Sequence, residues 1–183
     1  MTRSLAVTLN ALALFGVALV LVVAFAAQIL LHELPCPLCL LQRILFALLA
    51  VGPILNVRFG PRPSHYAVSL LAAIAGAAFA ARQVLLHIMP GDAGYGSALL
   101  GYHYYSWAFI GFAVAIIALA AVLLFDEQFR DDGKPQPGGA FARAAVWLVI
   151  ALTALNVVST LLECGFGACP DNPLAYELLK RAP

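Results

Sequence analysis

The sequence predicts an all-α integral membrane protein, built as a bundle of about five transmembrane helices. Of the 183 residues, 63% are hydrophobic and 10% are charged. A soluble domain with this balance would lack the polar side chains that cover a water-exposed surface. A helix needs roughly 20 apolar residues to cross a hydrocarbon core of about 30 Å, and the chain contains five runs of that kind. We therefore expect one transmembrane domain over residues 1–183.

The five apolar runs are rich in Ala, Leu and Val, and a helix lets such a run satisfy its own backbone hydrogen bonds in lipid. The first run exceeds the roughly 7–15 apolar residues of a signal peptide and has no clear small-x-small cleavage site before the cysteines, which favours a retained helix. The second is interrupted near its start by Gln42 and Arg43. The expected helices cover residues 4–31, 38–57, 66–86, 105–125 and 144–162, followed by a tail at 163–183.

The lysines and arginines of the short loops predict the orientation, because they gather on the cytoplasmic side. With the N-terminus inside, the cytoplasmic set is Arg3, Arg58, Arg62, Arg130, Lys134 and Arg143. The other basic residues, at or beyond the opposite face, are Arg43, Arg82, Lys180 and Arg181. This bias predicts a cytoplasmic N-terminus and an outer C-terminus. The net charge of +1 gives no reason to expect a nucleic acid partner.

The four cysteines form two pairs that the expected topology places on one side of the membrane. Cys36 and Cys39 in "CPLC" follow the first helix, and Cys164 and Cys169 in "ECGFGACP" follow the fifth. An odd number of crossings precedes each pair, so both reach the non-cytoplasmic face if all five runs cross. Thiols on the outer side of a bacterial-type inner membrane can be held as disulfides.

The first pair suits redox chemistry better than a structural bridge. A two-residue gap at a helix start closes a small loop, which gives little entropic stabilisation, and a helix N-terminus favours the thiolate. Two structural bridges remain an alternative. A tetrahedral metal site of four thiolates is disfavoured, because one pair abuts a membrane helix and the other has a four-residue gap. We expect no metal.

Arg43 lies four residues after Cys39, which puts it one turn away on the same helix face. A charge inside the membrane is costly enough to suggest a function. One interpretation is a fixed positive charge that stabilises the Cys39 thiolate and the negative charge on a bound electron acceptor. The other is an arginine that snorkels, so that its guanidinium reaches the lipid headgroups.

The segment "CPLCLLQR" resembles the signature of the DsbB family, inner-membrane enzymes that reoxidise a periplasmic thiol oxidase and pass the electrons to quinone. The resemblance implies that Cys39 faces the quinone and that Cys36 exchanges with the second pair. It also implies a set of quinone-binding candidates. This set is Gln42 and Arg43 in the motif, and Arg82, Gln83 and His87 in "ARQVLLHIMP" at the outer end of the third helix.

The resemblance further implies a thiol:quinone oxidoreductase of the bacterial inner membrane, with both cysteine pairs periplasmic. Its cofactor would be ubiquinone or menaquinone, its partner a periplasmic DsbA-like thiol oxidase, and its electron path Cys164 and Cys169 to Cys36 and Cys39 to quinone. One departure stands out. Four-helix members carry the second pair between helices three and four, whereas residues 87–107 here contain no cysteine. We expect the fifth helix to restore the second pair to the same face.

Two other functions are weighed against this one. A vitamin K epoxide reductase-like enzyme also uses quinone and a Cys-x-x-Cys motif, but usually carries the motif late in its bundle. A membrane scaffold with two structural disulfides would have no enzymatic activity. Its transport version would need polar residues near mid-bilayer, and this sequence has almost none there.

Three further features have simple structural interpretations. At the outer end of the fourth helix, an aromatic belt is favoured over a quinone contact for His103, Tyr104, Tyr105 and Trp107. Within the fifth helix, Asn156 is expected to form a hydrogen bond to another helix rather than to belong to the site. The last residues, 171–183, are expected to form a short amphipathic helix on the outer surface.

Overall fold

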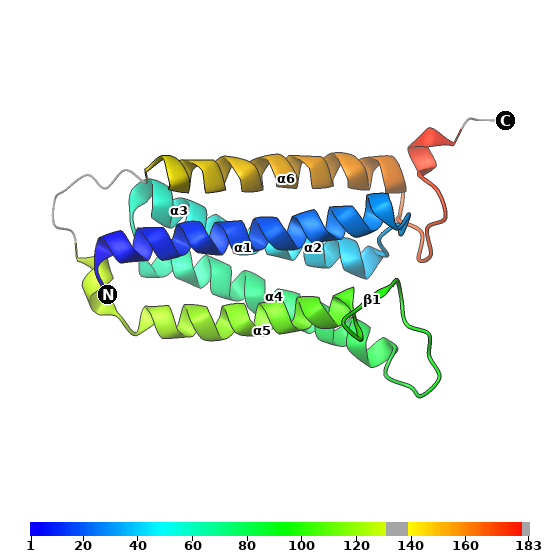
Figure 1. Ribbon diagram of the computed structural model, residues 1–183, viewed down its shortest axis with the longest axis horizontal. Helices are drawn as coiled ribbons and strands as arrows, with labels where there is room; N and C mark the ends of the chain where they lie inside the picture. Colours follow the sequence, from blue (N-terminus) through cyan, green and yellow to red (C-terminus); the bar gives the residue numbers. More distant parts are fainter. Residues whose placement is uncertain (131–138, 181–183) are drawn as a thin grey trace.

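The computed structural model describes residues 1–130 and 139–180 and is an all-α bundle (Figure 1). Within these residues, five helical segments are long and apolar enough to cross a membrane. The predicted fold class is therefore confirmed. The expectations for Lys134, Arg181 and the last residues of the tail lie outside the described residues.

Six α-helices make up the five segments, because the second segment contains two of them. The helices are α1 (Arg3–Leu30), α2 (Pro37–Leu49), α3 (Val51–Phe59), α4 (Pro63–Leu86), α5 (Tyr104–Leu123) and α6 (Ala140–Cys164). The short elements are the antiparallel strands β1 (Ala98–Leu99) and β2 (Tyr102–His103), and the 3₁₀ turns η1 (Asp126–Phe129) and η2 (Glu177–Leu179). The described part of the tail thus has one 3₁₀ turn where a short amphipathic helix was expected, and Pro173 disfavours helical backbone at Asn172.

The break between α2 and α3 follows from "VGP" at residues 51–53. Pro53 has no N–H group, so the carbonyl of Leu49, four residues earlier, loses its helical donor. The hydroxyl of Ser69 on α4 donates to that carbonyl instead, at 2.7 Å. Gly52 allows this approach, because a Cβ there would lie 2.2 Å from the His65 carbonyl oxygen and 2.3 Å from Ser69 Oγ.

The helices pack in an order that leaves α1 and α5 on either side of α2. α1 packs against α6 and α3, α2 against α4, and α4 against α5 (Figure 1). The α4–α5 contact depends on Gly76, since a Cβ there would lie 2.4 Å from the ring of Phe112, which is fully buried. Phe112 also stacks on Phe46 of α2, with ring centroids 4.0 Å apart. Small residues permit such close approach between membrane helices.

A buried polar cluster joins α1, α3, α4 and η1 at the end of the bundle where α1 begins. Asn56 donates to Asn10 at 3.0 Å, Asn10 donates to Tyr66 at 2.8 Å, and Tyr66 donates to Gln128 at 3.0 Å. Gln128 in turn donates to the carbonyls of Val122 and Phe125. Because these amides and the hydroxyl all have partners, the cluster links four elements without leaving a buried polar group unpaired.

Both cysteine pairs lie at the other end of the bundle. Figure 1 shows that α2 begins and α6 ends at the same end, as the count of crossings predicts. The second pair therefore lies at the same end as the first, although the loop between α4 and α5 contains no cysteine. Which face of the membrane this end meets stays a prediction.

Candidate functional site

The first cysteine pair is built into the N-terminus of α2. Cys36 and Cys39 form a disulfide, with Cα atoms 5.0 Å apart. Cys36 is the N-cap residue, and its Sγ accepts a hydrogen bond from the backbone N–H of Cys39 at 3.2 Å. Pro37 occupies the first helical turn, where a missing N–H costs nothing. The sulfur atoms therefore lie at the positive end of a helix dipole, which favours a thiolate when the disulfide is cleaved.

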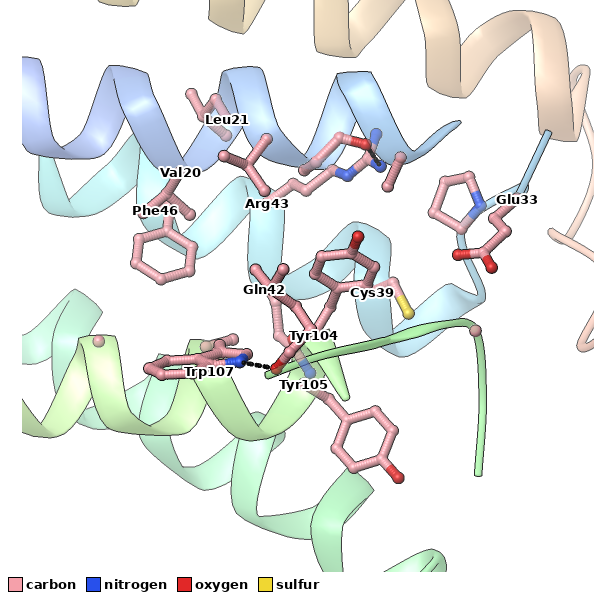
Figure 2. Close-up of a pocket in the computed structure, with 18 of the residues that line it drawn as sticks. Val20, Leu21, Glu33, Cys39, Gln42, Arg43, Phe46, Tyr104, Tyr105 and Trp107 are labelled. Carbon is pink, nitrogen blue, oxygen red and sulfur yellow. Dashed lines mark hydrogen bonds between the residues drawn. The ribbon is translucent and has the colours of Figure 1, made fainter. Parts of the chain in front are cut away.

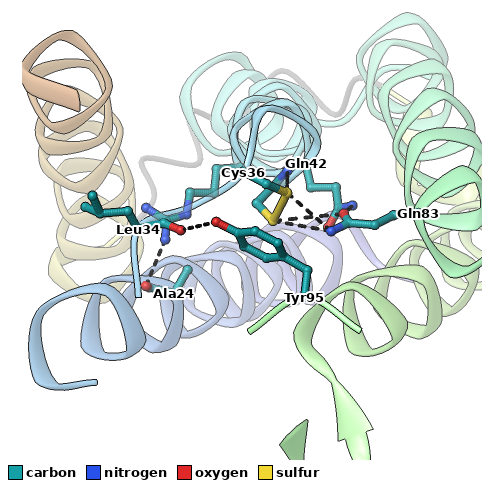
Figure 3. Close-up of a disulfide and its surroundings, with 8 residues drawn as sticks. Ala24, Leu34, Cys36, Gln42, Gln83 and Tyr95 are labelled. Atoms are coloured by element: carbon teal, nitrogen blue, oxygen red, sulfur yellow. Dashed lines mark hydrogen bonds between the residues drawn. A yellow bond between two sulfur atoms is a disulfide. The ribbon is translucent and has the colours of Figure 1, made fainter. Parts of the chain in front are cut away.

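Gln83 on α4 is the polar side chain that contacts both sulfur atoms. It is only 1% exposed, and its amide nitrogen donates to Cys36 Sγ at 3.3 Å and to Cys39 Sγ at 3.5 Å (Figure 3). Gln42 donates to Gln83 Oε1 at 2.8 Å, which fixes the amide so that its N–H groups face the sulfurs. Hydrogen bonds strengthen when the acceptor becomes charged, so this pair of glutamines favours the reduced, thiolate form.

The Arg43 side chain turns away from the sulfurs and toward α1 (Figure 2). Its guanidinium donates to Gln28 Oε1 at 2.7 Å and to the Ala24 carbonyl at 2.9 Å, and lies 5.5 Å from the centre of the Phe25 ring. The guanidinium is thus bound by protein oxygens within the bundle, which differs from an arginine that snorkels to headgroups. Its role toward a quinone stays a prediction.

The structure separates Arg82 and His87 from the other candidates. Successive helical residues point about 100° apart, so the residue before Gln83 faces outward and Arg82 is exposed. His87 caps the end of α4, where its ring accepts or donates a hydrogen bond at 3.1 Å to Asp92 and stacks near Tyr105. Hydrogen bonds from the Gly94 N–H and His87 hold the pKa of Asp92 below its ordinary value. Neither Arg82 nor His87 lines the cavity beside Cys39.

A cavity of about 400 Å³ lies beside Cys39, between α1 and α5 (Figure 2). Gln42, Arg43 and Phe46 of α2 line it together with Cys39. This volume is within the range of small-molecule sites. Apolar side chains that are exposed on the lipid-facing surface form its rim. They are Leu19, Val20 and Val23 of α1 and Trp107 and Ile110 of α5. The cavity therefore connects the lipid-facing surface of the bundle with the first disulfide.

Aromatic side chains and the loop between α4 and α5 close this cavity at the end of the bundle that carries the cysteines. Tyr104, Tyr105 and Trp107 line it, so these predicted belt residues also face the site. Tyr95 donates to the Leu34 carbonyl at 2.6 Å (Figure 3), and Ser97 donates to the Glu33 carboxylate. Burial first, and then the charges of Glu163 and Glu33, raise the pKa of Tyr95, which keeps its hydroxyl a donor.

The second cysteine pair lies at the end of α6. Cys164 is the last residue of α6 and forms a disulfide with Cys169, with Cα atoms 4.5 Å apart. Gly165 ends the helix with φ of 65°, a conformation that glycine adopts without strain. A second cavity, of about 590 Å³, runs between α2 and α6 and is lined by both of these cysteines and by Arg43. Arg43 thus lines both the cavity beside Cys39 and the cavity beside the second pair.

Asn156 faces this second cavity and does not join two helices. Its amide nitrogen donates to the Leu152 carbonyl of its own helix at 3.0 Å, and its Oδ1 is buried with no hydrogen-bond partner in the described ranges 1–130 and 139–180. The predicted hydrogen bond between helices is therefore wrong. The α2 side chains across the cavity are apolar apart from Arg43, which is bonded to α1.

A family model described as "Disulfide bond formation protein DsbB" matches residues 6–98. This region holds the first cysteine pair, both glutamines and Arg43. The chain belongs to the DsbB family. The match confirms the predicted resemblance and favours it over the vitamin K epoxide reductase-like and scaffold alternatives.

Curated DsbB relatives cover the same part of the chain. The Disulfide bond formation protein B of Xanthomonas axonopodis pv. citri (strain 306) is 42% identical over 76 residues, which are 38% of this chain and 44% of the relative. Disulfide bond formation protein B 2 of Burkholderia lata is 42% identical over 65 residues, 35% of this chain and 39% of the relative. The chain thus matches less than half the length of these relatives. No solved structure matches it significantly.

The DsbB match ends before α5 and α6, so the second cysteine pair lies outside it. Sequence reasoning selected Gln83 and Gln42, and the structure brings them together at the sulfurs. It missed Tyr95, whose bond to Leu34 has no sequence signal because it spans a loop of irregular backbone. It also missed Glu163, although an acidic residue in an apolar helix, directly before Cys164, is a signal that the sequence shows.

Proposed function

We propose that this DsbB-family protein is a thiol:quinone oxidoreductase that reoxidises a periplasmic thioredoxin-fold thiol oxidase of the DsbA kind. One observation carries the proposal: the Cys39 end of the first disulfide lines a cavity that reaches the lipid-facing surface between α1 and α5. A lipid-soluble electron acceptor could enter there and meet a cysteine without crossing water. Ubiquinone and menaquinone both belong to this chemical class.

The residues around the cavity fit a quinone headgroup. Arg43 and Gln42 provide N–H donors beside Cys39, Phe46 and the tyrosines provide apolar and aromatic surface, and the aliphatic rim matches a prenyl tail. A bound quinone would accept two electrons and two protons. The chain's own part is to hold the Cys39 sulfur at the helix N-terminus, with Gln83 favouring its thiolate.

The second pair would receive electrons from the partner. A thiolate of the reduced oxidase attacks the Cys164–Cys169 disulfide, forming a mixed disulfide and releasing one thiolate, and its second thiolate resolves the mixed disulfide. The partner leaves oxidised and the pair becomes a dithiol, so two electrons and two protons have moved. Phe166 and Leu174, exposed by 92% and 90%, flank this pair and provide apolar surface for a docking partner.

The dithiol at Cys164 and Cys169 then exchanges with the disulfide at Cys36 and Cys39. Both pairs lie at the same end of the bundle, and Arg43 lines the cavities beside each of them. Basic residues support the orientation, since α1 begins and α3 ends at the opposite end, with Arg3 and Arg58. The positive-inside rule then makes the cysteine end periplasmic in a bacterial inner membrane.

Anaerobic quinone reduction tests this function directly. Purified protein is mixed with a reduced thioredoxin-fold oxidase as donor and with ubiquinone or menaquinone as acceptor. We expect quinone reduction by the wild type and its loss in Cys39→Ala, with the bundle still folded by circular dichroism. Unfolding of Cys39→Ala, together with no quinone reduction by the wild type, would instead support a scaffold with structural disulfides.

A further inference from the structure

Glu163 is a buried acid that the proposed electron path does not use. It precedes Cys164 at the end of α6 and is 0% exposed. Neither of its carboxylate oxygens has a hydrogen-bond partner among the residues that the structure describes. Burying a carboxyl group without a partner costs folding free energy, and this cost suggests a functional role for Glu163.

The face of α6 that carries Glu163 packs against α1, where Gln28 binds Arg43. Ser159 lies one turn earlier on the same face of α6, and it accepts a hydrogen bond from Gln28 of α1 at 2.8 Å. Gln28 in turn accepts from Arg43 at 2.7 Å. This chain of contacts directs the face of α6 that carries Glu163 toward Gln28 of α1 and the Arg43 guanidinium.

Two ionisable groups among the described residues interact with the charge of Glu163, and a third interacts with Arg43. The two are Arg43 of α2 and Tyr95 of the α4–α5 loop, and the third is Tyr176 of the tail. Tyr176 also accepts a hydrogen bond from Gln28 at 3.0 Å. Arg43 is near but not paired, since no ion pair within 4 Å joins the two side chains in the described part of the chain.

We propose that Glu163 carries the proton that must move between the two cysteine pairs during their exchange. The inference deepens the proposed function and rests on it. Its observations are the burial of Glu163, its unpartnered oxygens among the described residues, its place directly before Cys164, and its side of α6, which faces Gln28 and Arg43.

The exchange proceeds in two steps, the formation of a mixed disulfide and its resolution, and protons and electrons balance in each. The Glu163 carboxylate takes a proton from a thiol of the reduced second pair, and the resulting thiolate attacks the Cys36–Cys39 disulfide. A mixed disulfide forms, and the thiolate released from the first pair takes the proton back from Glu163. The same cycle repeats for the second thiol, which resolves the mixed disulfide. Cys164–Cys169 ends as a disulfide, Cys36 and Cys39 end as thiols, and Glu163 is regenerated.

The test measures transfer between the pairs in the full-length protein. The wild type and Glu163→Gln are mixed rapidly with reduced oxidase, quenched in acid and alkylated, and the redox state of each pair is read by mass spectrometry. General acid–base groups contribute about 10²- to 10⁴-fold, so Glu163→Gln should slow transfer between the pairs by that factor at neutral pH. Attack of the oxidase on the second pair should keep its rate.

The pH profile separates proton transfer from a structural role. Without Glu163, the rate should rise about tenfold per pH unit as the attacking thiol ionises unaided, whereas the wild type should depend on pH less steeply. Glu163→Asp, which keeps a carboxyl group, should restore part of the rate. The matched control is Glu177→Gln, because Glu177 is a surface residue bonded to Lys180 at 2.6 Å. It should behave as the wild type.

The outcomes distinguish this inference from the proposed function. The inference alone is overturned if the wild type reduces quinone but Glu163→Gln transfers electrons between the pairs within twofold of the wild-type rate and with the same pH profile. A wild type that reduces no quinone overturns both. If Glu163→Gln does not fold, infrared difference spectra of the oxidised and reduced wild type with ¹³C-labelled glutamate replace it. A labelled carboxyl band that changes on reduction supports the proton carrier, and an unchanged band overturns it.

Discussion

Replacing Gln83 with leucine should make the first disulfide harder to reduce. Gln83 donates to both sulfur atoms, at 3.3 and 3.5 Å. A hydrogen bond to a charged group contributes about 1.5–3 kcal/mol and one to a neutral group about 0.5–1.5 kcal/mol. The reduced form, once a thiolate forms, therefore gains about 1–1.5 kcal/mol more from this amide than the disulfide does. For a two-electron couple, 1.4 kcal/mol corresponds to about 30 mV.

The expected shift is therefore about 20–30 mV to more negative potential. The assay equilibrates the Cys36–Cys39 pair with a thiol–disulfide redox buffer in a background of Cys164→Ala and Cys169→Ala, so that one couple titrates. Gln42→Leu should shift the potential in the same direction by less, since Gln42 only orients Gln83. A double-mutant cycle should show the two effects to be non-additive.

Arg82→Ala is the matched control, because this exposed neighbour on α4 points away from the site. It should leave the potential unchanged. An unchanged potential in Gln83→Leu, or a shift to more positive values, would refute the argument that the amide favours the thiolate. The experiment also tests the prediction from sequence that Arg82 belongs to the quinone site, since quinone turnover can be followed in the same variant.

Two further perturbations test the cavity and the packing. Arg43→Ala should raise the quinone KM or slow turnover while thiol exchange persists, because it removes a donor from the cavity beside Cys39; an unchanged quinone dependence would contradict this. Gly76→Ala should destabilise the bundle by about 1–3 kcal/mol, since its Cβ would meet the Phe112 ring at 2.4 Å. Thermal unfolding in detergent measures the loss, and Gly16→Ala, where a Cβ has open space, is the control.

The helical bundle could be predicted from the sequence because the apolar composition of its segments determines it. Apolar runs long enough to cross a bilayer specify helices almost regardless of their neighbours. The break at Ala50 was also readable in principle, since Gly52 and Pro53 mark it. The expected bounds for the second span were close to the observed Pro37–Phe59.

The site was readable only in part, because its geometry depends on the register between helices. The motif itself located Cys36, Cys39, Gln42 and Arg43, but nothing in it says that Gln83, and not Arg82, faces the sulfurs. That choice is set by how α4 rotates against α2, through contacts such as Ser69 with the Leu49 carbonyl. The Arg43 guanidinium is another case, since its partners are Gln28 and a backbone carbonyl of α1.

The placement of the second pair depends on a buried polar connection that ties α6 to the DsbB-like part of the chain. Gln28 is 3% exposed, and it bonds Ser159 of α6, Tyr176 of the tail and Arg43 of α2 at once. The contacts with Ser159 and Tyr176 join residues outside the matched region to Gln28 inside it. A helix that slid or rotated would leave a buried guanidinium or amide unpaired, at about 1–3 kcal/mol each. The same contacts that pair the Arg43 guanidinium therefore hold α6 against α1 at the end of the bundle that carries both cysteine pairs, an arrangement that the proposed exchange requires.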